Sequence, residues 1–275
     1  MPTVLVTGAS RGIGNTIATH LAAKGWDVFA GVRTEDDAAR LRGSPRITPV
    51  RLDVTDEKDI AALDQSLPPR LDAVVNNAGV VVAGPLETVP LADLRRQLDI
   101  NVTGQIAVTQ AVLPRLRSSR GRIVFISSLN GKIAFPLIGP YCASKFAIEA
   151  AADALRVELT PWRINVVVVE PAQTDTDMWR TADAMADDTV AAMTDDARRL
   201  YDKHVVGLRK SIPLSRRIAV PPEKVAAVVE ESLTARRPRA RYVVGLGPKL
   251  QLALITRLPT GIRDRVVRGV TRQPG

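Results

Sequence analysis

Short apolar runs alternate along most of the chain with longer segments whose apolar residues recur at helical spacing. The runs predict strands, and the run 164–169, polar only at Asn165, is typical of a strand in a sheet covered on both faces. The longer segments predict helices, clearest over 12–24, 100–116 and 143–159. The predicted strands cover residues 3–7, 27–32, 47–52, 71–76, 121–127, 163–169 and 241–244.

This alternation predicts the α/β class: an open, doubly wound parallel sheet of about seven strands with helices on both faces. A chain of 275 residues suits a single domain, 1–275. Two regions depart from the pattern. Segment 173–215 is rich in Asp, Ala and Thr, and segment 248–275 mixes apolar pairs with arginines. We expect both to be additions at the carboxyl ends of the strands, where such sheets bind ligands.

Charge is unevenly distributed. The net charge is +9, but from Val205 onward there are 15 Lys and Arg against 4 Asp and Glu, so the rest carries −2. No aromatic interleaving, zinc spacing or basic-helix pattern accompanies this charge, so we expect a solvated face and no nucleic-acid partner. Contact with an anionic membrane surface is the less favoured alternative, because Pro259 and Gly261 interrupt an amphipathic helix. A substrate lid or a subunit contact is preferred for this segment.

Composition changes the picture little. The chain is 45% hydrophobic and 24% charged, as in globular proteins, and Cys142 is its one cysteine, which precludes an intrachain disulfide. Residues 1–30 lack a signal-peptide pattern, and no stretch approaches the roughly 20 apolar residues of a membrane span. We therefore expect a cytoplasmic protein. The two histidines, His20 and His204, lack metal-ligand spacing, so no metal site is predicted.

A glycine-rich loop directly follows the first predicted strand, in the sequence Thr7-Gly8-Ala9-Ser10-Arg11-Gly12-Ile13-Gly14. The order reads as strand, tight turn and helix. Glycines allow the backbone to approach a pyrophosphate, and the amino terminus of the helix offers free N–H groups and the positive end of a dipole. The loop therefore predicts a dinucleotide site.

Tyr141, Lys145 and Ser128 indicate what is done with that dinucleotide. Lys145 lies four residues after Tyr141, so on one helix the two share a face. An ammonium group nearby would lower the phenol pKa from its usual value near 10 and make acid–base work feasible at neutral pH. Cys142 has no acid or base partner in its neighbourhood, and we expect a small buried residue there.

Five motifs, which follow one another in the family's order and spacing over about residues 3–180, make the chain resemble the short-chain dehydrogenase/reductase family. Besides the glycine loop and the Tyr-x-x-x-Lys pair, they include Asn76-Asn77-Ala78-Gly79, Leu52-Asp53-Val54 and the segment from Pro171 to Thr176. The resemblance implies a Rossmann-like fold and a nicotinamide cofactor. One departure is Ala172, where the family usually has glycine after the proline.

The resemblance also implies roles for single residues. Tyr141 exchanges a proton with the substrate oxygen, and Ser128, 13 residues before it, donates a hydrogen bond to that oxygen. Lys145 bonds the nicotinamide ribose, and Asn101, expected to open a helix, positions a water beside Lys145. The residues expected to contact the cofactor are Gly8, Ser10, Arg11, Ile13, Gly14, Arg33, Asp53, Val54, Asn76, Ala78, Gly79, Tyr141, Lys145, Pro171, Thr174 and Thr176.

The end of the second strand favours NADP(H). A carboxylate there would bond the ribose hydroxyls and repel a 2′-phosphate, but the sequence has Val32 followed by Arg33. Arg11 lies on the same side of the adenosine, and two guanidinium groups suit a phosphate. The alternative is that Arg33 is a solvated charge and that Glu35, Asp36 or Asp37 reaches the ribose, which gives NAD(H).

The substrate is indicated least. An apolar set at 129–138 favours a bulky hydrophobic ketone or secondary alcohol, with Met178 and Trp179 closing over it. Segment 28–33 and the extended carboxyl-terminal segment look like those of the steroid- and retinol-dehydrogenase branch of the family. The alternatives are an NAD(H)-dependent alcohol dehydrogenase for small polar substrates and a cofactor-sensing protein without turnover. Family members usually form homodimers or homotetramers through the helices after Asn101 and Tyr141, which we expect here. The apolar set is Leu129, Ile133, Phe135, Pro136, Leu137 and Ile138.

Overall fold

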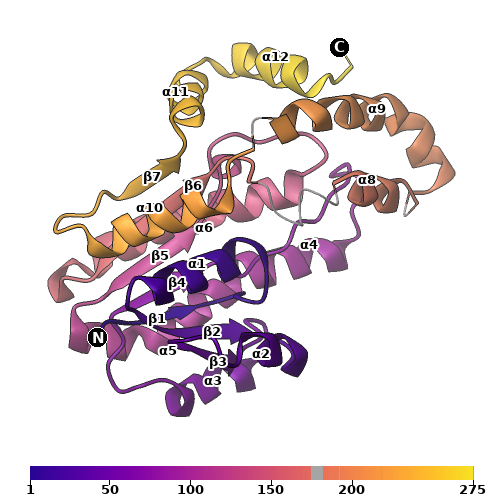
Figure 1. The fold of residues 1–275 in the computed structure, drawn as a ribbon. Coiled ribbons are helices and arrows are strands. Elements are labelled where there is room, and N and C mark those ends of the chain that lie inside the picture. The colour runs from indigo at the N-terminus through magenta and orange to yellow at the C-terminus, as the bar shows by residue number, and fades with distance from the viewer. Residues whose placement is uncertain (175–181, 192, 218, 275) are drawn as a thin grey trace.

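The computed structural model describes residues 1–174, 182–191, 193–217 and 219–274 (Figure 1). All seven predicted strands are present, and they form one parallel sheet in the order β3-β2-β1-β4-β5-β6-β7. The chain order reverses beside β1, which confirms the doubly wound arrangement. The strands are β1 (Thr3–Val6), β2 (Asp27–Val32), β3 (Ile47–Arg51), β4 (Ala73–Asn76), β5 (Arg122–Ile126), β6 (Asn165–Pro171) and β7 (Arg241–Val244).

Helices cover both faces of this sheet, as its unbroken apolar strands predict. They are α1 (Gly12–Ala23), α2 (Glu35–Leu41), α3 (Glu57–Ser66), α4 (Leu91–Leu98), α5 (Gly104–Ser119), α6 (Gly139–Glu158), α8 (Ala182–Ala191), α9 (Asp195–Arg217), α10 (Pro222–Thr234), α11 (Leu246–Ile255) and α12 (Thr260–Thr271). Short helical turns also lie at Asp99–Thr103, Leu129–Gly131 and Thr160–Trp162.

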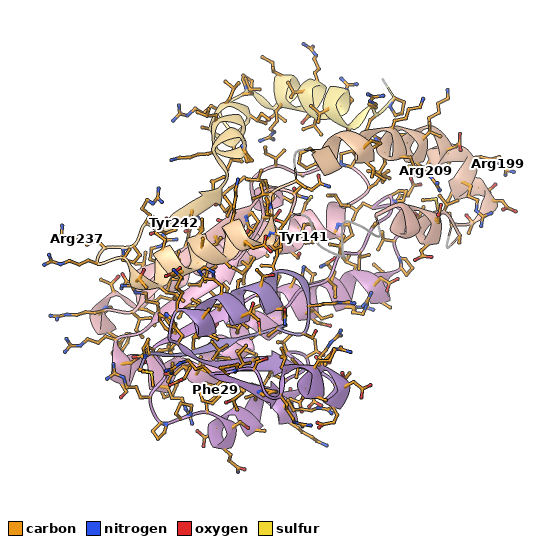
Figure 2. The ribbon with its side chains drawn as sticks, in the orientation of Figure 1. Phe29, Tyr141, Arg199, Arg209, Arg237 and Tyr242 are labelled. Carbon is orange, nitrogen blue, oxygen red and sulfur yellow. The ribbon has the colours of Figure 1, made fainter. Side chains whose placement is uncertain are left out.

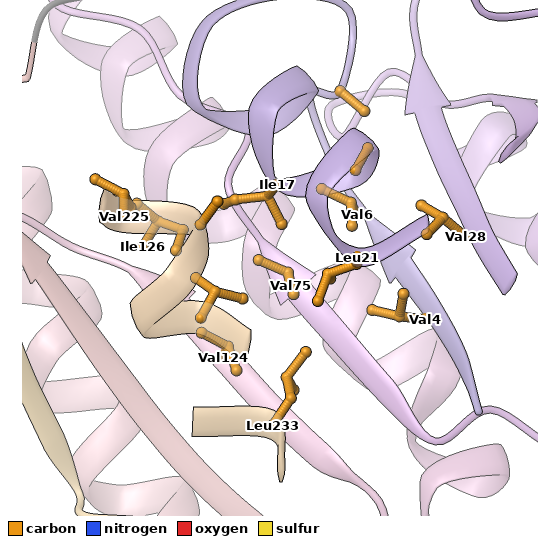
Figure 3. Packing of buried hydrophobic residues seen from close by; sticks show 14 of the residues in the cluster. Val4, Val6, Ile17, Leu21, Val28, Val75, Val124, Ile126, Val225 and Leu233 are labelled. Carbon is orange, nitrogen blue, oxygen red and sulfur yellow. The ribbon is translucent and has the colours of Figure 1, made fainter. Parts of the chain in front are cut away.

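Successive strand residues point to opposite faces and build two separate cores. On one face Val4, Val6 and Val75 pack with Ile17 and Leu21 of α1 and with Val225 and Leu233 of α10 (Figure 3). On the other face the intervening residues pack against α3, α5 and α6. Its fully buried members include Leu5, Val74, Ile123, Phe125, Val108, Val112, Leu116 and Ile148.

Two elements differ from the sequence-based expectation. Strand β6 runs to Pro171, two residues beyond the predicted end, because Glu170 and Pro171 pair with Val243 and Val244 of β7. Asn101 does not open a helix. It lies in a π-helical turn, Asp99–Thr103, that joins α4 to α5, so the prediction for its helix position was wrong.

Helices α9, α11 and α12 lie at the end of the molecule toward which the strands point (Figure 1). Strand β7 turns into α11 through Gly245, whose φ of +96° suits glycine. A side chain at Gly207 of α9 would place its Cβ 2.3 Å from the carbonyl oxygen of Arg272, so this glycine lets α9 approach the chain end beyond α12. Among the described residues, no helix combines the length and the apolar character that crossing a bilayer requires.

Candidate active site

A cavity of about 1030 Å³ opens at the carboxyl ends of the strands. Its wall includes residues that follow β1, β2, β3, β4, β5 and β6, so the sheet brings together segments far apart in sequence. Most of the predicted site residues line it. They are Gly8, Ser10, Arg11, Ile13, Gly14, Arg33, Asp53, Val54, Ala78, Gly79, Ser128, Tyr141, Lys145, Pro171 and Thr174.

The glycine loop is held closely against the end of β4. The Thr7 hydroxyl oxygen accepts hydrogen bonds from the backbone N–H groups of Asn77 and Ala78, both at 3.0 Å. Gly8 has a φ of +64°, and a Cβ at Gly14 would lie 2.2 Å from the Gly8 carbonyl oxygen. Only glycine fits at these two positions, because a side chain would force the loop open.

The loop fits a phosphate-bearing ligand. Arg11 occupies the N-cap position of α1 without a side-chain hydrogen bond to the helix, and the first turn of α1 contains no acidic residue. The N–H groups of that turn therefore remain for an anion, and the helix dipole adds to the attraction. The dinucleotide predicted from sequence is compatible with these residues, since glycine backbone and helix terminus both face the cavity.

Positive charge surrounds the end of the cavity beside β2 and β3. Arg11 and Arg33 line it and are exposed. Burial by itself raises the pKa of Asp53, but hydrogen bonds from Thr55 and the charges of Arg33 and Arg51 outweigh it, so the pKa lies below its usual value. Asp53 is therefore an ionised acceptor.

The acidic residues after Arg33 are engaged elsewhere. Glu35 forms an ion pair with Arg42, and Asp37 forms one with Arg40. Neither Glu35, Asp36 nor Asp37 is part of the cavity wall.

Asn76 is not brought to the cavity, contrary to expectation. It is fully buried, and its Nδ2 donates to the Thr109 hydroxyl at 2.9 Å on α5. The next residue, Asn77, lines the cavity instead, and its Nδ2 donates to the carbonyl oxygens of Thr7 and Gly8 at 3.0 and 3.2 Å. Side chains alternate between the two faces of a strand, so which of two adjacent asparagines faces the ligand depends on where the strand ends. The sequence alone does not fix that position.

Ser128 and Tyr141 meet at the middle of the cavity wall. Ser128 follows β5, and Tyr141 lies in the first turn of α6, a helix that begins with Gly139-Pro140. Burial raises the pKa of Tyr141 to about 12, and a hydrogen bond with Ser128 opposes the rise. The phenol is therefore protonated at neutral pH, and the expected lowering of its pKa is not found in this structure.

Lys145 is buried one turn further along α6. Its Nζ donates to the Ile126 carbonyl oxygen at 2.8 Å and lies 5.6 Å from the centre of the Tyr141 ring. Burial lowers the pKa of Lys145 to about 8, while the charge of Glu149 opposes that fall. Lys145 is thus close enough to Tyr141 to act on it, but desolvation of both groups dominates over their mutual interaction.

Asn101 lies beneath the cavity rather than in its wall. Its Oδ1 accepts from the Val80 N–H at 2.9 Å, and its Nδ2 donates to the Val80 carbonyl oxygen at 3.0 Å and to the Ser144 hydroxyl at 3.1 Å. These bonds occupy both ends of the side-chain amide. Asn101 therefore ties the loop after β4 to α6, one residue before Lys145.

The segment after β6 forms the far wall. Pro171, Ala172, Gln173 and Thr174 line the cavity, and the Thr174 hydroxyl donates to the Ala172 carbonyl oxygen at 3.0 Å. Ala172 is accommodated, since it is not among the residues with positive φ. Thr176, Met178 and Trp179, also expected here, lie outside the described residues.

The other end of the cavity is apolar. Leu129, Ile133, Phe135, Pro136 and Ile138 line it as expected, whereas Leu137 turns away into the interior. Sequence reasoning expected additions near this end but did not identify which of their residues reach it. These are Leu208 and Ser211 on α9, Gly247, Pro248, Leu252 and Ile255 on or beside α11, and Val266, Val267, Val270 and Thr271 on α12. Figure 2 labels Tyr141, which is partly buried, near the centre of the view, and Arg199 and Arg209, which are exposed, on α9.

Comparison with known proteins identifies this arrangement. A family model described as short chain dehydrogenase matches residues 2–187. The chain is 34% identical to an NADPH-dependent 3-dehydrocapnine reductase of Ornithobacterium rhinotracheale, over 95% of this chain and 94% of that protein. It is equally 34% identical to human 17-beta-hydroxysteroid dehydrogenase type 6, over 96% and 87%.

The fold has close counterparts among solved structures. A short chain dehydrogenase from Burkholderia cenocepacia J2315, solved in complex with NADP, superposes with a TM-score of 0.76 at 22% identity, covering 96% of each chain. At that identity the likeness concerns the fold. With the family match, it makes this protein an oxidoreductase that transfers hydride between a nicotinamide cofactor and a hydroxyl or carbonyl group. The chain belongs to the short-chain dehydrogenase family.

Proposed function

We propose that the protein is an NADP(H)-dependent oxidoreductase that interconverts a bulky hydrophobic ketone and its secondary alcohol in one catalytic domain. The observation that carries this proposal is the apolar end of the 1030 Å³ cavity, beyond Ser128 and Tyr141. Aliphatic side chains of α11 and α12 close that end, and such walls favour apolar ligands. Relatives named for hydroxysteroids and for retinol, both apolar molecules, support the same class.

The bound nicotinamide would supply or accept the hydride. In the reducing direction, a phenol that keeps its proton at neutral pH is the required acid, so the raised pKa of Tyr141 suits proton donation to the developing alkoxide. Ser128, at the same wall, donates a hydrogen bond to that oxygen. Lys145 holds a positive charge below pH 8 near the ring, and this charge favours the phenolate left after proton transfer.

The preference for NADP(H) rests on Arg11 and Arg33. Both line the cavity, while the nearby acidic residues Glu35 and Asp37 are paired with other arginines. The relative named as an NADPH-dependent reductase agrees with this assignment. We expect Arg33→Ala to weaken NADPH binding by roughly 10- to 100-fold, as for loss of a charge-assisted hydrogen bond, with little effect on NADH.

Titration of nicotinamide fluorescence measures this preference. The matched control is Arg95→Ala, which removes an exposed arginine of α4 outside the cavity wall and should leave both affinities unchanged. Equal weakening of NADPH and NADH by Arg33→Ala would contradict a 2′-phosphate contact. Tighter NADH than NADPH in the wild type would favour the NAD(H)-dependent alternative.

A carbonyl screen with the tighter cofactor tests the substrate class. We expect turnover with long-chain, cyclic or polycyclic ketones and little with small polar ketones. Turnover of small polar ketones alone would overturn the hydrophobic assignment. Unchanged turnover in Tyr141→Phe would instead contradict the acid–base role of Tyr141, whereas cofactor binding with no turnover of any carbonyl would favour a protein that senses the cofactor.

The assembly and the carboxyl-terminal segment belong to the same proposal. Phe146 is 44% and Val157 73% exposed on α6, and the exposed Ala150 and Ala154 between them permit close helix packing, which supports a homodimer or homotetramer. Since α11 and α12 line the cavity, a substrate cover is favoured over a membrane anchor. Light scattering tests the assembly, and co-sedimentation with anionic vesicles tests the anchor.

A further inference from the structure

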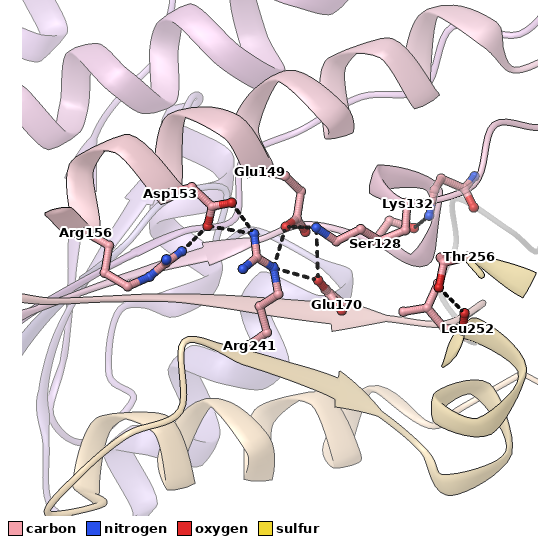
Figure 4. A network of polar contacts seen from close by, with 10 residues as sticks. Ser128, Lys132, Glu149, Asp153, Arg156, Glu170, Arg241, Leu252 and Thr256 are labelled. Atoms are coloured by element: carbon pink, nitrogen blue, oxygen red, sulfur yellow. Dashed lines mark hydrogen bonds and ion pairs between the residues drawn. The ribbon is translucent and has the colours of Figure 1, made fainter. Parts of the chain in front are cut away.

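A cluster of charged side chains joins α6, β6 and β7 (Figure 4). Its centre is Glu149, which follows Lys145 by one helical turn and is 5% exposed. Glu149 Oε2 lies 2.8 Å from Lys132 Nζ and 3.1 Å from Arg241 Nε. Its Oε1 has no hydrogen-bond partner among the described residues. A buried carboxylate with one free oxygen is costly, so its position calls for an explanation.

A second carboxyl group shares these cations. Glu170 of β6 is 1% exposed, and its Oε1 lies 3.4 Å from Arg241 Nε and 3.9 Å from Lys132 Nζ. Burial, and after it the charge of Glu149, raises the pKa of Glu170. Glu170 therefore keeps its proton to a higher pH than an ordinary carboxyl group does.

The cluster is built into the walls of the active site. Glu170 directly precedes Pro171, and Ser127 directly precedes Ser128. A Cβ at Gly131 would lie 2.8 Å from Ser127 Oγ and 3.0 Å from Glu149 Cγ, so this glycine makes room for the Glu149 side chain against the end of β5. Arg241 also forms two 2.7 Å contacts with Asp153, which anchors β7 to α6.

We propose that Glu149 is a positioning residue whose charge, oriented by Lys132 and Arg241, keeps Lys145 protonated during turnover. This inference rests on the role of Lys145 in the proposed function. Burial otherwise disfavours the charge of Lys145, and its neighbours the Ile126 carbonyl and the Tyr141 phenol carry no negative charge to offset it. The charged groups around it come from three elements and one loop: Glu149 on α6, Glu170 on β6, Arg241 on β7 and Lys132 after β5.

The negative charge of Glu149 raises the pKa of Lys145 and so opposes the loss of its proton. Glu149→Gln removes that charge and keeps the shape. We expect the alkaline limb of kcat/KM to move toward acid by about 0.5 to 1 pH unit, a roughly three- to tenfold loss of protonated lysine at a fixed alkaline pH. Glu149→Asp keeps the negative charge, so the alkaline limb of its kcat/KM profile should lie close to that of the wild type.

Titration of the ¹⁵Nζ signal of Lys145 in cofactor-free protein gives a readout that does not depend on activity. The same acid shift is expected there for Glu149→Gln. Glu170→Gln is the matched control, since Glu149 and not Glu170 is the carboxylate whose charge acts on Lys145, and it should leave the Lys145 titration within about 0.3 pH unit. An unshifted titration in folded Glu149→Gln would overturn the inference.

Two further variants keep the outcome decisive. If Glu149→Gln fails to fold, Lys132→Met removes a cation that faces Glu149, and it should move the Lys145 titration toward alkaline pH. No shift, or an acid shift, in that variant would also refute the inference. Lys145→Met separates the two proposals: retained turnover would contradict the proposed function itself, whereas lost turnover with an unshifted Glu149→Gln contradicts only the role of Glu149.

Discussion

Burial favours the neutral forms of both Tyr141 and Lys145, so the pKa of the first is raised and the pKa of the second is lowered. In Lys145 this preference has an energetic cost at neutral pH, because the ammonium group is charged there and lacks its hydration shell. A pKa of about 8 against the ordinary 10.5 corresponds to roughly 3 kcal/mol. The buried ammonium group therefore makes the folded protein less stable than an apolar side chain of similar length would at this position.

Lys145→Met should therefore stabilise the cofactor-free protein while removing activity. We expect a gain of about 1–3 kcal/mol at pH 7 in the free energy of unfolding, less than the full cost because the Ile126 carbonyl loses its partner. Between pH 8 and 10.5 the unfolded wild type retains this lysine proton more often than the folded wild type. Wild-type stability consequently rises over that range, and the advantage of the variant disappears.

Urea unfolding at about pH 7 and about pH 10 measures the effect. Lys58→Met, at an exposed position of α3, is the control and should show no such pH-dependent difference. A variant less stable than the wild type at neutral pH, with the same dependence on pH, would contradict a buried ammonium at residue 145.

Sequence motifs predicted which residues lie at the site better than they predicted the environment of each. The spacing of Ser128, Tyr141 and Lys145 was sufficient to place all three on one wall. The direction of the tyrosine pKa was not predictable, because it depends on the depth of burial, which spacing does not encode. The asparagine that faces the cavity was predicted one residue too early, at Asn76, and Asn101 was predicted at the start of a helix in which it does not lie. Both errors arise because a strand end and a π-helical turn depend on tertiary hydrogen bonds.

At the scale of elements, the glycine loop depends on contact between backbone atoms. A Cβ at Gly14 would lie 2.2 Å from the Gly8 carbonyl oxygen and 2.4 Å from Asn77 Nδ2, and backbone cannot yield easily. We expect Gly14→Ala to lower the free energy of unfolding by about 1–3 kcal/mol, as for overpacking, and to abolish measurable cofactor binding.

The same substitution elsewhere gives the control. A Cβ at Gly261 of α12 would meet no atom within 4 Å, so Gly261→Ala should leave cofactor binding unchanged and stabilise the helix by at most about 1 kcal/mol. Thermal unfolding and nicotinamide fluorescence report both quantities. Normal cofactor affinity in Gly14→Ala would show that the loop can widen, contrary to its observed packing.

The strands were the most predictable elements. All seven were predicted from short, mainly apolar runs, with ends within two residues of those observed. Only the end of β6 depended on a partner: its last residues pair with β7, which is 70 residues away in sequence. A local pattern of apolar residues does not reveal pairing with a strand so distant in the sequence.

At the scale of the whole molecule, the substrate end of the cavity is assembled from distant segments. Val267 of α12 lines the wall, and replacing it by a charged residue places an unpaired charge against an apolar ligand. We expect Val267→Asp to raise KM for a hydrophobic ketone about tenfold or more, with the Kd for NADPH changed less than about twofold.

Steady-state kinetics with fluorescence titration tests this separation of effects. Ile262→Asp, on the same helix but 46% exposed and outside the cavity wall, should leave KM unchanged. Equal effects from the two substitutions would assign the change to destabilisation of α12 rather than to the wall.

The contribution of α9, α11 and α12 could be expected only in outline from sequence. The sequence indicated only additions at the carboxyl ends of the strands, and the structure shows that they contain the helices α9, α11 and α12. Which residues face the cavity depends on how α12 returns against α9, where Gly207 meets the Arg272 carbonyl. That approach joins segments 65 residues apart in the chain, beyond the reach of any local periodicity.

The order of segments along the chain has an evolutionary consequence. Every predicted cofactor and acid–base residue that lines the cavity falls at or before Thr174, whereas α9, α11 and α12 follow it. Under the proposed function, the gene therefore encodes the reacting groups first and much of the substrate wall last. We expect changes in its 3′ portion to alter what is recognised while hydride chemistry is inherited intact. Grafting the tail of a relative onto this protein is accordingly an engineering route to a new substrate.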